Sequence, residues 1–469
     1  MSTRIVVVGG GTAGARLAQR LPVTLLGEEP HAPYNRLLLA DVLAGRYGPE
    51  VIALPAAREP ARLGAGARAV RIDRAARTVE CADGSLVPYD RLVLATGAAP
   101  VLPPLRGLRG AQLPTGVHPF RTLDDCLALR ELVRPGVRAV VVGGGLLGVS
   151  AARALAAGGA EVMLTQQGER LMERQLDDEA AALLRTHLTD LGVEVHTECR
   201  VSGLRQQNGA VTAVELADGF VLDAQIVVLA CGVRPRVALA REAGLALRTG
   251  VVVDDELRTS DPYIHAIGDC AEHAGRVYGL AGPALEQADV LAELLTAEAD
   301  APAVPCGQSS RRAWGSPQGE ALGGGWATRD GAHAGAFRTR AHPHHEDAAP
   351  GPHVQAPGAE APAEVPPATD RPRYTGTRAL TRLTLGGAQP LDLAAFGEAT
   401  PLPGDDVVRL TDATRGAYRK VVVRGDRLVG GVLLGDLGAV GTLARAWEGD
   451  EALPDAPLLH LLTHDGGSS

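Results

Sequence analysis

The stretch that decides the fold covers residues 4–14 and reads RIVVVGGGTAG. A run of β-branched residues ends in glycines, and a helical pattern follows over residues 15–21. A second strand is expected at residues 23–27, VTLLG, and the acids Glu28 and Glu29 come directly after it. A strand, a glycine turn, a helix and a further strand in this order predict the start of a doubly wound α/β sheet.

The glycine turn has the spacing of a phosphate-binding loop. Gly9, Gly11 and Gly14 match G-x-G-x-x-G: the first glycine permits a tight turn, the second lets a pyrophosphate approach the backbone, and the third lets helix and strand pack closely. Thr12 and Ala13 lie at the start of the helix, where backbone N–H groups and the helix dipole favour phosphate. The sequence therefore predicts a dinucleotide site at this turn.

The acid after the second strand supports this interpretation. Glu28 lies where a ribose 2′-OH of a bound dinucleotide needs a hydrogen-bond acceptor. The glycine pattern alone is weak evidence, but two flanking strands and an acid in register make it specific. The alternative is a glycine-rich strand–helix turn that binds no ligand.

The same pattern occurs a second time. Strands are expected at residues 137–142 and 161–165, with a helix over residues 151–157 between them. The connecting turn contains glycines at the motif positions and two leucines at the helix start: Gly143, Gly145, Leu146, Leu147 and Gly148. Two complete sites imply two dinucleotides in one protein, with electrons passing between them. A decayed second site kept only as a scaffold is the alternative.

The second site differs from the first at the end of its second strand. Gln166 and Gln167 stand where the first site has acids. A glutamine can hydrogen-bond a ribose hydroxyl, but it neither repels nor clamps a 2′-phosphate. With Arg170 and Arg174 nearby in sequence, the choice between NADH and NADPH stays open.

Three further positions have chemistry that suits such sites. Arg36 follows a proline-rich loop, and a cation beside a pyrophosphate has an anion to bind. Asp269 begins a helix after a strand, where it could accept from a polyol hydroxyl or simply cap the helix. Cys231 reads as a small strand residue rather than a nucleophile, because no basic residue that would activate it is near in sequence.

The bulk composition bounds the possible functions. The 469 residues are 45% apolar and carry a net charge of −9, which suggests two to four domains and no nucleic-acid partner. The six cysteines form no C-x-x-C pair, which argues against a zinc ribbon, an iron–sulfur cluster or a thiol–disulfide centre. With a strand expected from Arg4 and no long apolar run, we expect neither a signal peptide nor a membrane partner, and a cytoplasmic location.

The last third of the chain contains two regions of different composition. Residues 299–372 are rich in Ala, Gly, Pro and His and predict a flexible linker, whose histidines suggest opportunistic rather than functional metal binding. A small mostly antiparallel C-terminal domain then follows over residues 373–469. Its expected strands cover residues 381–385, 407–410, 418–424 and 427–434, with a closing helix over residues 437–447.

These features together resemble a known family. The chain is similar to the pyridine nucleotide–disulfide oxidoreductase superfamily, and more narrowly to the flavoprotein half of assimilatory nitrite reductase large subunits and to electron-transfer subunits of assimilatory nitrate reductase. The likeness covers about residues 4–298 and 373–440. The runs RTLDDC at residues 121–126 and LMERQLD at residues 171–177 are its more specific segments.

The resemblance implies FAD at the first site and NAD(P)H at the second. Its residues for FAD are Gly9, Gly11, Gly14, Glu28, Arg36, Thr96, Gly97 and Asp269, and those for the nucleotide are Gly143, Gly145, Gly148 and Gly232. It also implies an α/β fold of two Rossmann-like domains. The FAD-binding domain would comprise residues 1–115 and 246–298, split by an NAD(P)H-binding domain at residues 116–245.

The implied activity is that of an FAD-dependent NAD(P)H oxidoreductase that passes electrons to a separate redox protein. No catalytic side chain is expected, because the two cofactors carry the chemistry. The favoured acceptor is a nitrate or nitrite reductase catalytic subunit, since the cysteines of a sirohaem module are missing here. The alternatives are a ferredoxin or rubredoxin reductase and a flavin-binding redox sensor without turnover.

Two departures from the family pattern motivate the sensor alternative. Relatives often have Ser-Lys or Ser after the Arg36 loop, where this chain has Ala40 and Asp41, and many have Glu where this chain has Ser150. Both positions lie close in sequence to expected cofactor residues. They leave dinucleotide binding intact but affect the flavin potential or the nicotinamide pocket.

Overall fold

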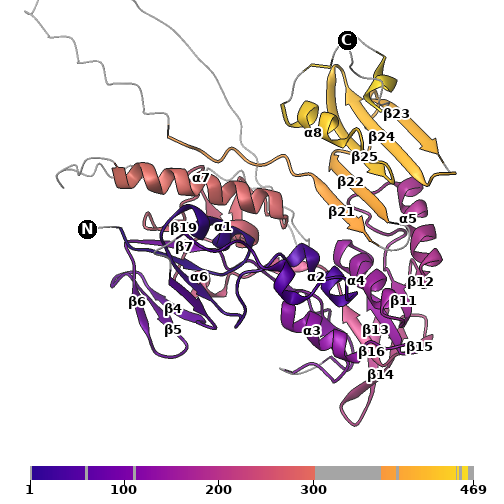
Figure 1. Ribbon diagram of the computed structural model, residues 1–469, viewed down its shortest axis with the longest axis horizontal. Helices are drawn as coiled ribbons and strands as arrows, with labels where there is room; N and C mark the ends of the chain where they lie inside the picture. The colour runs from indigo at the N-terminus through magenta and orange to yellow at the C-terminus, as the bar shows by residue number, and fades with distance from the viewer. Residues whose placement is uncertain are drawn as a thin grey trace, which may run out of the picture. The chain divides into compact units, whose positions relative to one another are not determined.

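The computed structural model describes residues 3–58, 62–108, 112–300, 371–386, 390–412, 414–449, 452–453 and 457–462, all within one unit formed by residues 1–300 and 371–469 (Figure 1). The predicted linker lies almost entirely outside these residues, and so do its histidines. The division into domains at the residue numbers given above stays a prediction.

The first sheet is fully parallel and contains the decisive strand at its centre. Its order is β19-β7-β1-β2-β3, with β1 at Ile5–Val8, β2 at Thr24–Gly27, β3 at Arg62–Ala65, β7 at Arg91–Leu94 and β19 at Ile264–Ala266. All four residues of β1 are buried, which explains their uniformly apolar sequence. Helices α1 (Thr12–Arg20) and α7 (Ala281–Asp300) pack on one another beside this sheet.

The second sheet repeats the first. Its order is β12-β11-β10-β16-β9, with β9 at Val117–Pro119, β10 at Arg138–Val142, β11 at Glu161–Thr165, β12 at Val193–His196 and β16 at Ile226–Leu229. Its helices are α3 at Leu123–Leu132, α4 at Leu146–Ala157 and α5 at Asp178–Asp190. As in the first sheet, the strand before the glycine turn lies between the strand that follows its helix and a strand from much later in the chain.

Smaller elements connect and flank the two sheets. Two three-stranded antiparallel sheets contain β4 (Ala69–Asp73), β5 (Thr78–Cys81) and β6 (Leu86–Pro88), and β13 (Val201–Gln207), β14 (Ala210–Leu216) and β15 (Val221–Asp223). Two strand pairs join β8 (Ala98–Pro100) to β17 (Val233–Pro235) and β18 (Val251–Val253) to β20 (Ala271–His273). The remaining helices of this region are η1 (Arg36–Leu38), α2 (Leu39–Leu43), η2 (Pro49–Ile52), α6 (Ala238–Glu242) and η3 (Gly268–Cys270).

The C-terminal part is a five-stranded antiparallel sheet, as predicted. Its order is β21-β22-β25-β24-β23, with β21 at Thr381–Leu385, β22 at Leu391–Gly397, β23 at Asp406–Asp412, β24 at Ala417–Arg424 and β25 at Arg427–Leu434, followed by α8 (Val440–Gly449) and η4 (Leu458–Leu461). The sequence analysis overlooked β22, whose run LDLAAF is almost wholly buried and therefore lacks alternation. It also began the closing helix three residues too early.

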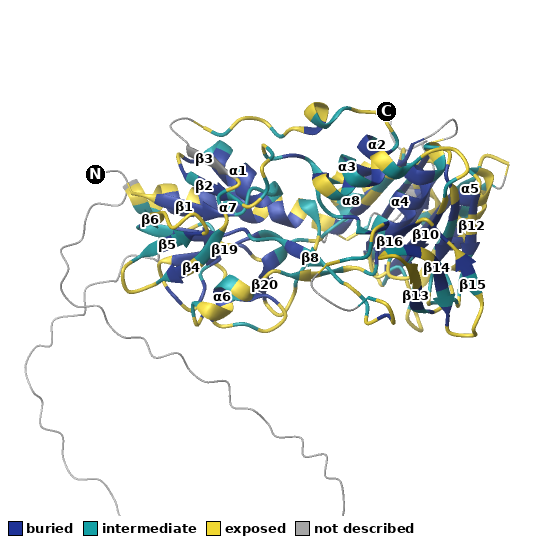
Figure 2. Ribbon diagram, turned by 90° about the horizontal axis from the view of Figure 1, so that it is seen from below, coloured by how far each residue is buried: buried dark blue, intermediate teal, exposed yellow. Residues whose placement is uncertain are grey.

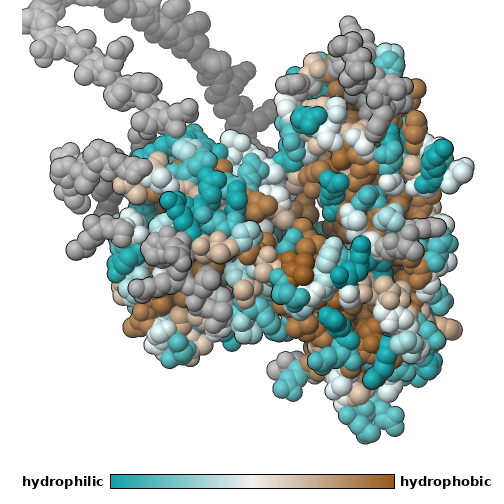
Figure 3. All heavy atoms as spheres, in the orientation of Figure 1, coloured by the Kyte–Doolittle hydropathy of each residue, from teal (hydrophilic) through white to brown (hydrophobic). Residues whose placement is uncertain are grey.

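Buried side chains run through every sheet of the described residues (Figure 2). One hydrophobic cluster joins α2 to α3 and α4 of the second sheet and to β21 and β22 of the C-terminal sheet. Around α2 the surface is also partly apolar: Figure 3 shows hydrophobic side chains in that region, and Leu37, Tyr47 and Val51 nearby in sequence are exposed. The short helix α2 is therefore packed mainly against parts of the chain other than its own parallel sheet.

None of the helices within the described residues combines the length and the apolar character that crossing a membrane requires. The described residues also contain no group of three or more His, Cys, Asp or Glu side chains arranged to hold a metal ion.

Candidate functional site

The first glycine turn follows β1 and leads directly into α1. Gly9 has a φ of +117°, and a Cβ at this position would lie 2.0 Å from the carbonyl oxygen of Ala95. A Cβ at Gly14 would lie 2.0 Å from the carbonyl oxygen of Gly9, whereas one at Gly11 would meet nothing within 4 Å. Two glycines are thus required by packing, and the middle one faces open space. This arrangement fits a phosphate group approaching the backbone at Gly11.

The helix after this turn begins earlier than its apolar pattern suggested. Gly11 caps α1 with extended backbone and without a side-chain hydrogen bond, so the helix starts at Thr12 instead of Ala15. The backbone N–H groups of Thr12 and Ala13 therefore belong to the first helical turn, where no carbonyl within the helix accepts from them. That is the position predicted for them from the motif.

The second glycine turn has the same geometry. Gly143 has a φ of +110°, and a Cβ there would lie 2.5 Å from the carbonyl oxygen of Ala230. A Cβ at Gly148 would lie 1.7 Å from the oxygen of Gly143, while one at Gly145 would meet nothing within 4 Å. Leu146 and Leu147 start α4 as Thr12 and Ala13 start α1. A decayed site would have no need to keep the open middle position, so both turns are suited to bind phosphate.

The segments predicted to complete the first site converge on its turn. Gly97, with a φ of +69°, and Thr96 follow β7, the neighbour of β1. Gly268 lies against α1, because a Cβ on it would be 3.0 Å from the Cβ of Ala13, and it positions the adjacent Asp269. The sheet therefore brings Thr96, Gly97 and Asp269 to the same edge as the glycine turn.

Glu28 stands at the end of β2 with an arginine from the other half of the chain. Its Oε2 accepts from Nη1 of Arg236 at 2.5 Å, and its side chain is 51% exposed. The carbonyl oxygen of Arg236 accepts from the hydroxyl of Thr96 at 2.7 Å. Arg236 thus connects two predicted FAD-site residues, and the sequence analysis did not single it out.

Arg36 lies in a network with Glu29 and Tyr34. Its Nη2 donates to Oε1 of Glu29, and its Nη1 donates to the hydroxyl of Tyr34 at 3.1 Å. Tyr34 donates to Oε2 of Glu29 at 2.5 Å, and burial raises the pKa of its phenol. Tyr34 is buried and fixes Arg36. Because Glu29 already pairs with Arg36, the prediction that Arg36 binds an anion stays a prediction.

Asp269 is paired with an arginine that joins it to Arg36. Arg121 donates from Nη2 to Oδ2 of Asp269 at 2.7 Å, while its own carbonyl oxygen accepts from Arg36 at 2.9 Å. Asp269 lies inside the short helix η3, so the alternative of a plain helix cap does not describe it. Arg121 belongs to the run RTLDDC, which served in the sequence only as a family signature.

The nucleotide side of the second site is centred on Gln166. Its Oε1 accepts from the backbone N–H of Gly144 at 2.8 Å, which ties the end of β11 to the glycine turn. Arg170 donates to the carbonyl oxygen of Leu176 at 3.1 Å and to Oδ1 of Asp178 at 2.9 Å, so it is engaged elsewhere. Arg174 is exposed. Among the described residues, no side-chain or backbone acceptor is bonded to the amide N–H groups of Gln166, and its contact with a ribose stays a prediction.

Cys231 and Gly232 follow β16 and lie beside the second glycine turn. Gly232 has a φ of +94°, and a Cβ on it would meet nothing within 4 Å, so it borders open space as Gly97 does in the first half. The thiol of Cys231 contacts the carbonyl oxygen of Val142 at 3.5 Å, and burial raises its pKa. A raised pKa opposes thiolate formation, in agreement with its interpretation as a structural residue.

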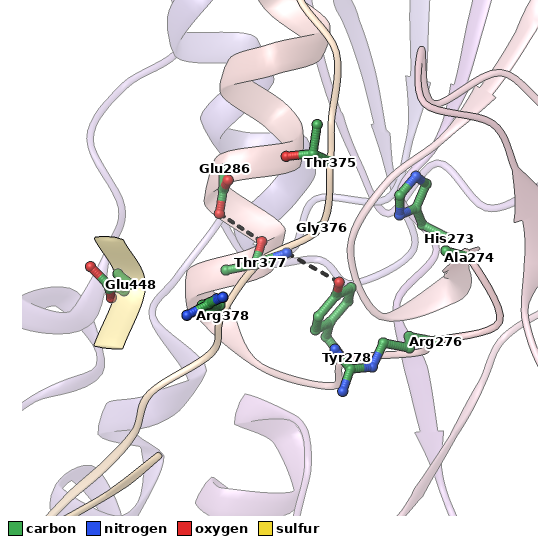
Figure 4. Close-up of a pocket in the computed structure, with 10 residues that line it drawn as sticks. All are labelled: His273, Ala274, Arg276, Tyr278, Glu286, Thr375, Gly376, Thr377, Arg378 and Glu448. Atoms are coloured by element: carbon green, nitrogen blue, oxygen red, sulfur yellow. Dashed lines mark hydrogen bonds between the residues drawn. The ribbon is translucent and has the colours of Figure 1, made fainter. Parts of the chain in front are cut away.

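Residues 374–378 form a hydrogen-bonded strap that links the first site to the C-terminal sheet. Gln287 on α7 is buried and accepts from the N–H of Gly268 at 2.7 Å. Near it, the N–H of Thr377 donates to the hydroxyl of Tyr278 at 3.1 Å, and the hydroxyl of Thr377 donates to Oε2 of Glu286 at 2.6 Å (Figure 4). Tyr278, Glu286 and Thr377 are among the residues that line a cavity of about 630 Å³. The strap is thus fixed to the first turns of the helix that also holds Gly268.

The fold and the two turns define the class of the protein. Two parallel sheets share the order of four strands, β7-β1-β2-β3 in the first and β16-β10-β11-β12 in the second, and each presents a glycine turn with an open middle position at the start of a helix. This is the architecture of a flavoprotein reductase that binds FAD and a nicotinamide dinucleotide.

The comparisons with known proteins give the family. The model of the pyridine nucleotide-disulphide oxidoreductase family matches residues 3–288, and that of the rubredoxin NAD+ reductase C-terminal domain matches residues 388–449. The chain belongs to the pyridine nucleotide-disulphide oxidoreductase family and is an FAD-dependent NAD(P)H oxidoreductase.

Relatives of known function fall into two groups. The chain is 35% identical over 303 residues to the assimilatory nitrate reductase electron transfer subunit of Bacillus subtilis, covering 62% of this chain and 38% of that protein. It is 29% identical to the nitrite reductase [NAD(P)H] of the same organism, covering 92% and 46%. It is also 35% identical to rhodocoxin reductase of Rhodococcus erythropolis, covering 62% and 72%. The chain thus spans less than half the length of the first two.

Solved structures show the same fold over nearly the whole chain. The putidaredoxin reductase of a covalent complex with putidaredoxin matches with a TM-score of 0.73 and 22% identity over 98% of both chains. A ferredoxin reductase from Rhodopseudomonas palustris matches with a TM-score of 0.72 and 24% identity over 96% of both.

Proposed function

We propose that this protein takes electrons from NAD(P)H and delivers them to a separate redox protein in nitrate or nitrite assimilation. The observation that carries the proposal is the pair of glycine turns with matching geometry, each with an open middle glycine. The likeness to the electron transfer subunit of Bacillus subtilis supports the assimilatory role. A cytoplasmic location is part of the same proposal.

The side chains of this protein would bind and orient rather than react. The turn at Gly11 would hold the pyrophosphate of FAD, and the carboxylates of Glu28 and Asp269 would accept from its hydroxyl groups. The turn at Gly145 would hold the pyrophosphate of the nicotinamide dinucleotide, with Gln166 near its ribose. Bound FAD supplies the chemistry, because it takes a hydride from the nicotinamide and releases electrons one at a time.

The acceptor would dock on the C-terminal domain. This domain is anchored to the strap beside the first site and offers a surface that the two dinucleotide sites do not use. An acceptor there would lie close to the segments that hold FAD, which suits electron transfer. The catalytic subunit of nitrate reductase is the acceptor we favour.

The experiment has two stages. The purified protein, supplied with FAD, is mixed anaerobically with NADH and with NADPH, and loss of the visible absorbance of the flavin is followed. The reduced protein is then mixed with the nitrate reductase catalytic subunit encoded in the same genome, and nitrite is measured. Rapid flavin bleaching followed by nitrite formation is expected. Failure of the first stage would leave only the redox-sensor function.

A second candidate is favoured by the match of residues 388–449 to the rubredoxin NAD+ reductase C-terminal domain. In that case the acceptor is a small iron–sulfur protein of the ferredoxin or rubredoxin type. Replacing the nitrate reductase subunit by ferredoxin or rubredoxin in the second stage separates the two. Faster reoxidation of the flavin by the small carrier would favour this candidate.

A further inference from the structure

A buried arginine joins three parts of the chain that are far apart in sequence. Arg153 on α4 has a side chain that is 3% exposed. Its Nη2 donates to Oδ1 of Asp41 on α2 at 2.9 Å, and its Nη1 donates to the carbonyl oxygen of Gly386, just after β21, at 2.8 Å. One guanidinium thus connects the first half of the chain, the second sheet and the C-terminal sheet.

The helices and strands around this arginine contribute mainly apolar side chains, although His187 on α5 lies near enough for Arg153 to help lower its pKa. Residues of α2, α4, β21 and β22 belong to one hydrophobic cluster. Placing a charge in such a core costs free energy that its ion pair repays only when the geometry is good. Apolar residues of similar size would pack here without that cost. The ion pair therefore contributes directional contacts more than net stability.

A second arginine lies beside Gly386. Arg46, which donates to Oδ1 of Asp41 at 3.2 Å, lies so close that its Nη1 would be 1.5 Å from a Cβ on residue 386. Any side chain at Gly386 would displace Arg46. Asp41 thus lies between two arginines, of which only Arg153 is buried.

Helices α2 and α4, which the Asp41–Arg153 ion pair joins, each begin next to one of the two predicted dinucleotide sites. Helix α4 begins at Leu146, directly after the glycine turn predicted to hold the nicotinamide dinucleotide. Helix α2 follows η1, which begins with Arg36 of the predicted FAD site. A rigid link between α2 and α4 therefore fixes one dinucleotide site relative to the other.

We propose that Arg153 is a positioning residue for hydride transfer, acting through Asp41 and Gly386 to hold the nicotinamide site in register with the flavin site. Hydride transfer needs the reacting atoms within about 3–3.5 Å, and a displacement of about 1 Å costs up to about a hundredfold in rate. The proposal holds for any electron acceptor, because flavin reduction precedes delivery.

The test replaces Arg153 in the FAD-loaded protein. Arg153→Met removes the charge and keeps most of the volume, Asp41→Asn removes the partner charge, and the double variant combines them. Arg409→Met is the matched control, because Arg409 on β23 pairs with Glu179 on α5 at 3.0 Å between the same two sheets, but both side chains are about half exposed. Four quantities are measured: FAD content, the Kd for NAD+, the limiting rate of flavin reduction in anaerobic stopped flow, and hydrogen exchange of α2 and α4.

We expect FAD content and the Kd to stay within about twofold, while the limiting rate falls by about tenfold or more in Arg153→Met. The double variant should be no slower than Arg153→Met, since both changes break one interaction. Hydrogen exchange in α2 should rise, also without nicotinamide present. Arg153→Lys should recover part of the rate, and Arg409→Met should match the parent protein.

An unchanged limiting rate in a folded Arg153→Met would overturn the proposal, and so would a loss of rate that merely follows loss of FAD. If Arg153→Met does not fold, Asp41→Asn and Arg153→Lys decide by the same criteria. If the parent protein itself is reduced by neither NADH nor NADPH, the assigned activity fails and not this proposal.

Discussion

Lys420, the only lysine of the 469 residues, donates from Nζ to Oδ2 of Asp177 at 2.8 Å. Asp177 caps α5 by accepting from the N–H of Ala180, and it also accepts from the hydroxyl of Tyr418 at 2.7 Å. Burial alone would raise the pKa of Asp177, but the hydrogen bonds from Lys420, Tyr418 and Ala180 outweigh it and lower the pKa. This contact anchors the C-terminal sheet to the second parallel sheet.

The first prediction concerns this anchor. Lys420→Met should lower the free energy of unfolding by about 1–3 kcal/mol, because it leaves a half-buried carboxylate with fewer partners. Urea unfolding at pH 7 measures the effect, and Arg409→Met, which breaks an exposed pair between the same sheets, should cost no more than about 1 kcal/mol. Since the pKa of Asp177 is lowered in the folded state, the difference between parent and Lys420→Met should shrink below about pH 4, where the carboxylate takes up a proton. A difference that is unaffected by acid would contradict this account.

The second prediction uses the two open glycines as a matched pair. Gly11→Ala and Gly145→Ala each place a methyl group in space that no protein atom occupies, so both variants should fold like the parent. Gly11→Ala should be purified with little or no flavin, because the methyl group occupies the expected phosphate position. Gly145→Ala should keep its flavin and show a KM for NAD(P)H raised by about tenfold. Flavin absorbance per protein and steady-state reduction of an artificial dye measure the two effects.

Gly14→Ala is the contrasting variant for this pair. Its methyl group would lie 2.0 Å from the oxygen of Gly9, so the damage should be to folding as well as to flavin binding. Loss of flavin from Gly145→Ala, with Gly11→Ala unaffected, would reverse the assignment of the two sites.

The fold could be predicted from the sequence where the residue pattern of a segment follows from the structure of that same segment. The runs before Gly9 and Gly143 are apolar because parallel strands are buried on both faces, and the glycines after them are needed for the turn, so both sheets could be anticipated. The antiparallel strands β24 and β25 were predicted closely because the turn at Gly425 marks their junction. Strand β22 was overlooked because it is buried along almost its whole length and resembles no alternating strand.

A site residue could be predicted only where it and the residues next to it in sequence form a recognisable motif. Arg121, Arg236 and Arg153 each act on residues more than a hundred positions away: Asp269, Glu28 and Asp41. An arginine among 46 basic residues gives no sign of such a partner until the sheets bring the segments together. The chain that joins Arg36 to Asp269 through Arg121 is therefore a property of the folded protein alone.

The third prediction concerns a buried histidine of the first sheet. His265 on β19 is 1% exposed, its Nδ1 has no hydrogen-bond partner, and burial lowers its pKa to about 4, against the opposing effect of Glu298. Between pH 6.5 and about 4 the unfolded chain binds a proton here and the folded chain does not, so stability falls as the pH is lowered through this range, by up to about 3 kcal/mol. His265→Gln should flatten this dependence, measured by urea unfolding at several pH values. The exposed His460→Gln serves as the control, and an equal flattening in both would contradict the prediction.

The fourth prediction addresses the choice of nicotinamide dinucleotide. Oε1 of Gln166 accepts from the N–H of Gly144, and Gln166→Glu keeps this acceptor while adding a negative charge at the end of β11. A carboxylate there accepts from the ribose 2′-OH of NADH and repels the 2′-phosphate of NADPH. The ratio of kcat/KM for NADH to that for NADPH should therefore rise by about tenfold. Gln167→Glu, which adds the same charge at an exposed position one residue later, is the control. If both variants shift the ratio equally, an added negative charge near the site is enough to explain the change. Gln166 is then not the residue that contacts the ribose.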